Sequence, residues 1–129
     1  MNAKSRGARP QKEWTRTHGW RCVCRSEELA EGNARGFDPA PDNGDDRAFV
    51  VRHGGTVYAY VNSCPHNARP LEYAKNRFLS GDGGEIICYA HGAHFDIDTG
   101  HCSYGPCLGQ SLRALVVVEY EGWIWAAAA

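Results

Sequence analysis

The sequence has no apolar segment long enough to cross a membrane, and it has no large excess of charge of either sign. A membrane-spanning helix needs about 20 consecutive apolar residues. The N-terminal residues MNAKSRGARPQKEW also lack the apolar stretch of a signal peptide. The formal net charge is -1 and the pI is near 6.6. We therefore expect a cytoplasmic protein that binds neither a membrane nor a nucleic acid.

Helical periodicity is scarce as well. Only SEELAEG, residues 26–32, has a helical pattern, and it is one or two turns long. Short β-rich runs are separated by glycines instead. Gly54 and Gly55 join two such runs and predict a hairpin over residues 48–62, and residues 82–84 separate two more. Short strands with glycine-rich turns indicate an all-β fold, a small sandwich or barrel of antiparallel sheets.

The length of 129 residues suits a single domain. Residues 1–17 are polar and basic and predict a flexible tail, so that the domain itself covers residues 18–129. Residues 33–46, rich in Pro, Gly and Asp, predict a surface loop. Towards the C-terminus, apolar alternation predicts one strand with a single apolar face, interrupted at Gly122. That face comprises Leu112, Ala114, Val116, Val118 and Tyr120.

Cysteine is plentiful, because six are present in a chain that we expect to lie in a reducing compartment, where metal or redox chemistry is a better expectation than disulfides. Two short motifs combine cysteine with histidine. One is Cys64-x-His66 and the other is Cys88-x-x-His91, each at the end of a predicted β run. Each loop therefore offers one thiolate and one imidazole.

Mixed loops favour a binuclear iron–sulfur centre, because one iron can bind the cysteine of each loop and the other iron the histidine of each loop. A structural zinc ion also binds two cysteines and two histidines. Zinc fingers, however, place both cysteines on one turn and both histidines on a helix. A zinc-stabilised interaction module remains an alternative at this point.

The two motifs resemble the signature of the Rieske [2Fe-2S] family, and the resemblance extends from about Trp20 to Trp125. It includes residues beyond the four ligand positions, namely Gly92, Phe95-Asp96, Thr99-Gly100 and Gly105-Pro106. The resemblance implies three stacked antiparallel sheets with a cluster-binding subdomain at about residues 64–107. It also implies one [2Fe-2S] cluster per chain. Its ligands would be Cys64 and Cys88 on the buried iron and His66 and His91 on the outer iron.

The resemblance is to the soluble, low-potential branch of the family. In high-potential members a disulfide ties the two cluster loops together, but the corresponding residues here are Arg69 and Ala90. Two hydroxyl donors of the second loop are replaced by Ala93 and Phe95. We therefore expect a reduction potential at or below about -100 mV, near the low end of the Rieske range.

The resemblance implies a ferredoxin that carries one electron at a time, as a component of an oxidoreductase system and not as an enzyme itself. The sequence has no glycine-rich nucleotide fingerprint, so we expect a separate flavoprotein reductase as donor. The acceptor would be a terminal oxygenase or another oxidoreductase. The alternative within this chemistry is the small subunit of a larger oxidoreductase, such as an assimilatory nitrite reductase.

The spacer between the motifs, residues 67–87, is longer than we expect for a compact Rieske ferredoxin. Its basic residues Arg69, Lys75 and Arg77 predict a docking surface for a redox partner beside the histidines.

The remaining candidates receive structural interpretations. His94 alternates with inward-facing neighbours and is expected to be solvated. Cys22 and Cys24 are expected on one face of a strand as small core residues. A disulfide between Cys102 and Cys107 is possible but not favoured. The aromatic residues of GWIWA are expected in the core or on a sheet face.

Overall fold

The computed structural model describes residues 19–39 and 45–127, and the predicted basic tail lies outside them. Within these ranges the chain forms ten short strands and one 3₁₀ turn, η1 (Ser26–Glu28). The strands are β1 (Trp20–Arg25), β2 (Ala34–Phe37), β3 (Ala48–His53), β4 (Thr56–Val61), β5 (Ile86–Cys88), β6 (Ala93–Phe95), β7 (Cys102–Tyr104), β8 (Ala114–Leu115), β9 (Val117–Tyr120) and β10 (Trp123–Ala127).

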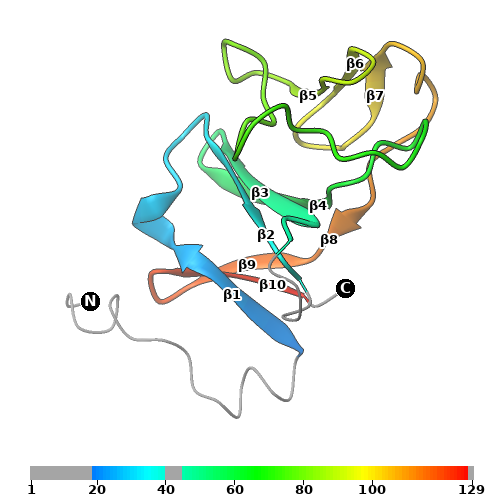
Figure 1. Ribbon diagram of the computed structural model, residues 1–129. Coiled ribbons are helices and arrows are strands. Elements are labelled where there is room, and N and C mark those ends of the chain that lie inside the picture. Colours follow the sequence, from blue (N-terminus) through cyan, green and yellow to red (C-terminus); the bar gives the residue numbers. More distant parts are fainter. Residues whose placement is uncertain (1–18, 40–44, 128–129) are drawn as a thin grey trace.

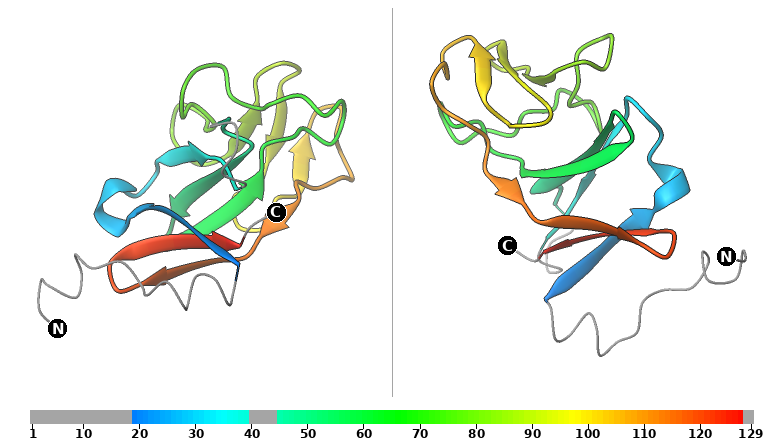
Figure 2. Two further views of the ribbon diagram at one scale, coloured as in Figure 1. Left: turned by 60° about the horizontal axis from the view of Figure 1, so that its bottom comes forward. Right: turned by 180° about the vertical axis from the view of Figure 1, so that it is seen from behind.

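The strands pair into three antiparallel sheets, as the family resemblance implied. Their strand orders are β1-β10-β9, β2-β3-β4-β8 and β5-β6-β7. Figure 1 shows the β5-β6-β7 sheet at one end of the molecule, the β1-β10-β9 sheet at the other, and the four-stranded sheet between them. The views in Figure 2 agree that the segment carrying both Cys-His motifs lies at the end away from β1 and β10.

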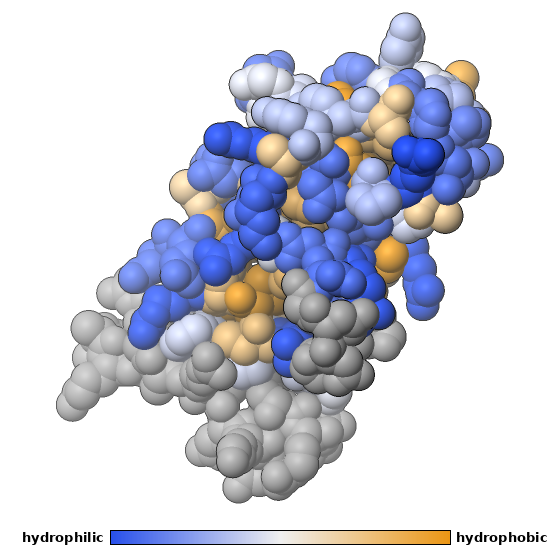
Figure 3. Space-filling model, in the orientation of Figure 1, coloured by the Kyte–Doolittle hydropathy of each residue, from blue (hydrophilic) through white to orange (hydrophobic). Residues whose placement is uncertain are grey.

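Strand β3 shows how one element serves two cores. Its residues alternate in direction, so Phe49 and Val51 join the core beneath β5-β6-β7, and Ala48 and Val50 join the core against β10. All four are fully buried, because the central sheet is covered on both faces. On the face seen in Figure 3, hydrophobic residues are visible mainly in recesses between hydrophilic ones.

The hairpin predicted for residues 48–62 is confirmed. Strands β3 and β4 pair from Ala48–Val61 to His53–Thr56 around Gly54 and Gly55, which have φ angles of 61° and 81°. Only glycine adopts such angles without steric cost. No helix among the described residues is long and apolar enough to span a membrane.

The helical pattern of residues 26–32, one or two turns by prediction, forms the single 3₁₀ turn η1, since an isolated stretch this short cannot repay the cost of helix nucleation. A second prediction near the N-terminus was wrong in extent. The loop predicted for residues 33–46 contains β2, which pairs with β3 as an edge strand. Tertiary pairing therefore overrides a local composition that is typical of loops.

The single apolar face predicted for the C-terminal strand was also wrong. The chain leaves the central sheet after β8 and enters the β1-β10-β9 sheet at β9, so the alternation changes at Val116. Leu112 is 5% exposed, but Val116 is 63% exposed and Tyr120 is 47% exposed.

Strand β1 has a bulge at Val23, where its pairing with β10 shifts by one residue. Cys22 pairs with Trp125 and Cys24 with the next residue, Ile124, so the two cysteines do not share one face as predicted. Cys24 is buried in the core and Cys22 is half-buried. Trp125 and Ile124 are buried too, which confirms the interpretation of GWIWA as core.

Candidate metal centre

The two Cys-His loops have the same backbone turn. The Cys64 carbonyl accepts a hydrogen bond of 2.7 Å from the Ala68 amide, and the Cys88 carbonyl accepts one of 2.8 Å from the Gly92 amide. In both loops the residue four positions after the cysteine has a left-handed conformation, with φ of 62° at Ala68 and 74° at Gly92. In each loop the histidine therefore lies within a tight turn that starts at its cysteine.

The thiols of Cys64 and Cys88 are fully buried and in hydrogen-bond contact with each other. Burial raises the pKa of both thiols, because a thiolate is penalised away from water. Backbone N–H groups oppose this effect: that of His66 faces Cys64, and those of His91 and Ala90 face Cys88. Buried sulfurs with amide donors fit a metal centre, because a bound metal ion deprotonates coordinating thiols.

The two imidazoles lie side by side and are exposed. The ring centroids of His66 and His91 are 5.2 Å apart with an interplanar angle of 80°, and the Asn67 amide nitrogen lies 3.0 Å from His91 Nδ1. The fold therefore pairs sulfur with sulfur inside and imidazole with imidazole at the surface. Among residues 19–39 and 45–127 no group of three or more such side chains is gathered around a single metal position.

Asn62 holds the first loop in place, a role that sequence reasoning missed. Its side-chain nitrogen donates to the Asp46 carbonyl and to the Glu72 carboxylate, both at 2.8 Å. Its side-chain oxygen accepts from the Leu71 amide at 2.8 Å. Asn62 is 8% exposed, and only a short polar side chain with both donor and acceptor could satisfy these groups.

A third loop, residues 105–110, closes against the second Cys-His loop. Gly105 has φ of 102°, and a Cβ there would lie 2.8 Å from the Cα of Ala93. The loop brings Cys107, fully buried, to an Sγ–Sγ distance of 3.4 Å from Cys64. Sequence reasoning missed this contact, and the only signal for it was the cysteine directly after Gly105-Pro106.

The possible disulfide between Cys102 and Cys107 is not formed. The Cys102 thiol donates to the Tyr104 carbonyl at 3.2 Å. Cys107 faces Cys64 instead. Cys102 in β7 and Cys107 in the third loop therefore have separate environments.

The long spacer is anchored in the core and forms a groove beside the candidate centre. Leu71 and Phe78 are fully buried, and Phe78 stacks on Phe49 with ring centroids 4.3 Å apart. Tyr73 packs edge-on against Tyr89 at 4.5 Å. The groove, of about 380 Å³, is lined by Arg69, Pro70, Glu72, Tyr73, Tyr89 and Ala90. Arg69 and Ala90, which replace the loop cysteines of high-potential relatives, thus lie close together without a bridge.

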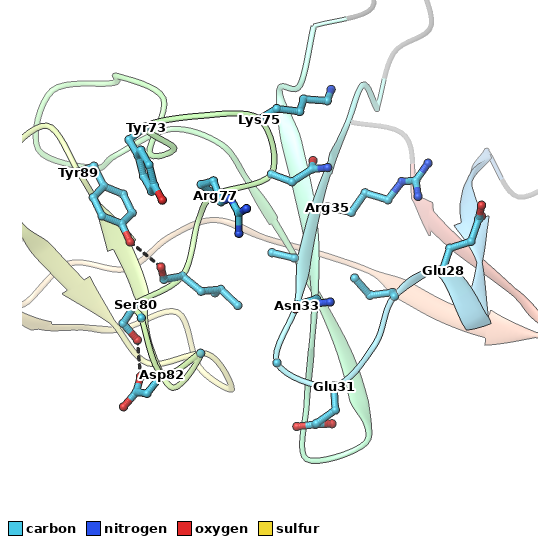
Figure 4. A pocket seen from close by; sticks show the side chains of 17 residues that line it. Glu28, Glu31, Asn33, Arg35, Tyr73, Lys75, Arg77, Ser80, Asp82 and Tyr89 are labelled. Carbon is cyan, nitrogen blue, oxygen red and sulfur yellow. Dashed lines mark hydrogen bonds between the residues drawn. The ribbon is translucent and has the colours of Figure 1, made fainter.

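A larger polar cleft of about 680 Å³ continues from the same tyrosines towards β2 (Figure 4). Arg35, Lys75 and Arg77 line it, and its acidic residues bond to nearby turns. Glu31 accepts from the amides of Gly54 and Gly55, at 2.6 and 2.9 Å. Lys75 forms an ion pair of 2.7 Å with Asp46. The predicted basic cluster is therefore partly neutralised.

His94 is not part of the candidate centre. Its neighbours Ala93 and Phe95 are fully buried, whereas the imidazole lies 2.9 Å from the Glu85 carboxylate and packs edge-on against Tyr104. The predicted outward direction of His94 is confirmed, with a partner that the sequence did not suggest.

Comparisons with known proteins agree with this architecture. The family model of the Rieske [2Fe-2S] domain matches residues 19–121. The ferredoxin component of the alkene monooxygenase system of Xanthobacter autotrophicus is 32% identical over 78 residues, which span 60% of this chain and 57% of that relative.

Two solved structures have the same fold. The ferredoxin of carbazole 1,9a-dioxygenase from Nocardioides aromaticivorans IC177 is 29% identical with a TM-score of 0.65, over 85% of this chain and 98% of that one. A chain from the complex of reduced oxygenase and oxidized ferredoxin in carbazole 1,9a-dioxygenase is 26% identical with a TM-score of 0.68, over 86% and 94%. The chain described here therefore belongs to the Rieske [2Fe-2S] domain family.

Proposed function

We propose that this chain is a Rieske-type ferredoxin, a one-electron carrier between a flavoprotein reductase and a terminal oxygenase or another oxidoreductase. The observation that carries the proposal is the pairing of side chains across the two loops. The Cys64 and Cys88 thiols meet in the interior, and the His66 and His91 imidazoles meet at the surface. This separation suits two metal ions with different ligands better than one ion with four.

Burial supports the assignment of ligands that the family resemblance implies. Cys64 and Cys88 would hold the inner iron, and His66 and His91 would hold the outer iron of a [2Fe-2S] cluster. The cluster would supply reversible one-electron chemistry when bound. The chain's own residues exclude water from the sulfurs, donate backbone N–H groups to them, and leave the imidazole edges accessible to a partner protein.

The comparisons support a role as carrier, since two of the similar proteins are described as ferredoxins of oxygenase systems. A carrier needs no substrate pocket at the cluster, only a surface where a partner can dock. The groove lined by Arg69, Tyr73 and Tyr89 lies beside the second Cys-His loop and fits that requirement. We propose that partners dock on the exposed histidines and this groove, with Arg69 contributing more than Lys75, whose charge is paired with Asp46.

The cofactor itself gives the direct test. Protein purified without oxygen should contain about two iron and two sulfide ions per chain and should be reddish-brown, with a colour that is bleached by a one-electron reductant and restored by oxidation. A colourless protein with one zinc ion per chain would support the interaction module instead. Stable co-purification with a large oxidoreductase chain would favour the small-subunit alternative.

The ligand assignment is tested by replacing a neutral ligand with a charged one. We expect His91→Cys or His66→Cys, where the cluster still assembles, to lower the reduction potential markedly, because a thiolate adds negative charge beside the iron. His94→Cys is the matched control, since His94 lies outside the centre and pairs with Glu85. Redox titration of the three variants decides the point, and unchanged potentials for His66→Cys and His91→Cys would remove these histidines as ligands.

A further inference from the structure

We propose that Cys107 sets the redox poise of the centre: its thiol donates a hydrogen bond to the sulfur of Cys64 and makes the cluster easier to reduce. Nothing in the family signature assigns this residue a role. The inference rests on the proposed function, because it concerns the potential of the cluster that Cys64 would ligate. Cys107 would act through its hydrogen bond to Cys64 and would not itself bind iron.

The contact is short, buried and held by the surrounding backbone. The two sulfurs are 3.4 Å apart and both residues are fully buried. The backbone of the third loop is closed by hydrogen bonds on both sides of Cys107. The Leu108 amide donates to the Gly105 carbonyl at 3.1 Å, and the Gln110 amide donates to the Cys107 carbonyl at 2.8 Å. The thiol therefore stays beside Cys64.

The direction of the hydrogen bond follows from metal binding. Between two free thiols either sulfur could donate. A cysteine that ligates iron is a thiolate and has no proton, so the proton between the two sulfurs must then belong to Cys107. A thiol is a weak donor in water. In a water-free interior, however, a hydrogen bond to a charged acceptor is considerably stronger.

Such a donor favours the reduced state. One electron from the reductase adds one negative charge to the cluster and its thiolates, and a hydrogen bond to a ligand sulfur stabilises that charge. The proton stays on Cys107, so no proton is taken up at this contact. Ala93 and Phe95 have no hydroxyl group to offer, which increases the relative weight of the Cys107 thiol.

Redox titration of cluster-loaded variants tests the inference. In Cys107→Ala the equilibrium constant for one-electron reduction should fall about three- to tenfold, which is a potential lower by about 30 to 60 mV at roughly 59 mV per tenfold. Cys107→Ser replaces a weak thiol donor with a stronger hydroxyl donor and should have a potential above wild type. Cys102→Ala is the matched control, because it removes another buried cysteine whose thiol donates to the Tyr104 carbonyl and not to a ligand.

The possible outcomes separate this inference from the proposed function. Wild-type protein without a [2Fe-2S] spectrum would overturn the function itself. A normal spectrum with equal potentials for wild type, Cys107→Ala and Cys102→Ala would overturn only the role of Cys107. If Cys107→Ala assembles no cluster, Cys107→Ser decides alone: a potential above wild type supports the inference, because a hydroxyl donates more strongly than a thiol, and one at or below wild type contradicts it.

Discussion

At the scale of single residues, Arg52 connects the central sheet to its neighbours. From β3 its Nε donates to the Leu29 carbonyl at 2.7 Å, and its Nη2 lies 2.6 Å from the carboxylate of Glu119 in β9. The hydrogen bond from this guanidinium holds the pKa of Glu119 below its ordinary value of 4.5. The Arg52 side chain is 15% exposed and that of Glu119 is 34% exposed. Solvent therefore screens the pair only in part.

We expect Glu119→Gln to lower the free energy of unfolding near pH 7 by about 1 kcal/mol, the usual range for a partly exposed charged pair. Because the folded protein lowers the pKa of Glu119, the stabilisation is complete above pH 4.5 and is lost as the pH falls through the folded-state pKa. The difference between wild type and variant should therefore shrink at acid pH. Urea unfolding at several pH values measures it, and a constant difference into the acid range would contradict the linkage.

At the scale of elements, the third loop depends on one glycine. Gly105 has a positive φ and also lies so close to β6 that a Cβ would overlap the Ala93 backbone. Gly109, in the same loop, has φ of 91° but nothing within 4 Å of its Cβ position. Substitution of Gly109 would therefore cause backbone strain alone, whereas substitution of Gly105 would cause strain and steric overlap.

We expect Gly105→Ala to displace the third loop from β6 and to lower the iron content of the purified protein, in addition to a strain of about 1–3 kcal/mol. Gly109→Ala should show a loss of stability from strain with normal iron content. Iron analysis and thermal unfolding of both variants make the comparison. Full iron content in Gly105→Ala would show that the close approach to Ala93 is not needed for the centre.

At the scale of the whole molecule, the chain segments that carry the two Cys-His motifs and line the groove lie at the end opposite β1 and β10 (Figure 1). Arg69 lines the groove, whereas Arg25 in β1 lies over the Trp123 ring at the other end, 4.6 Å from its centroid. Charge at the groove should steer a partner, and charge at the far end should not, because salt screens interactions beyond about 8–10 Å.

We expect Arg69→Glu to slow reduction of the protein by a flavoprotein reductase, most strongly at low ionic strength. Arg25→Glu makes the same change of charge at the far end and should leave the rate near wild type. Stopped-flow reduction at several salt concentrations gives both rates. Equal salt dependence for the two variants would place docking elsewhere, without bearing on the cluster.

The sequence alone was sufficient for the family and for the all-β fold. The Cys-x-His and Cys-x-x-His spacings describe local turns, and the glycine at position 54 or 122 marks a turn whatever the rest of the chain does. The spacing also yields the candidate ligands, because each loop carries its own pair. These features depend on residues that are close in the chain, so local patterns express them.

Only the tertiary structure decided which distant residues meet. Cys107 lies beside Cys64 across 43 residues, since the third loop packs on the second and both pack on the first. The exposure of Val116 follows from a change of sheet between β8 and β9. The spacer became the wall of a groove because Leu71 and Phe78 are buried in the core. Such contacts depend on how whole sheets and loops pack, and no local pattern of residues encodes that packing.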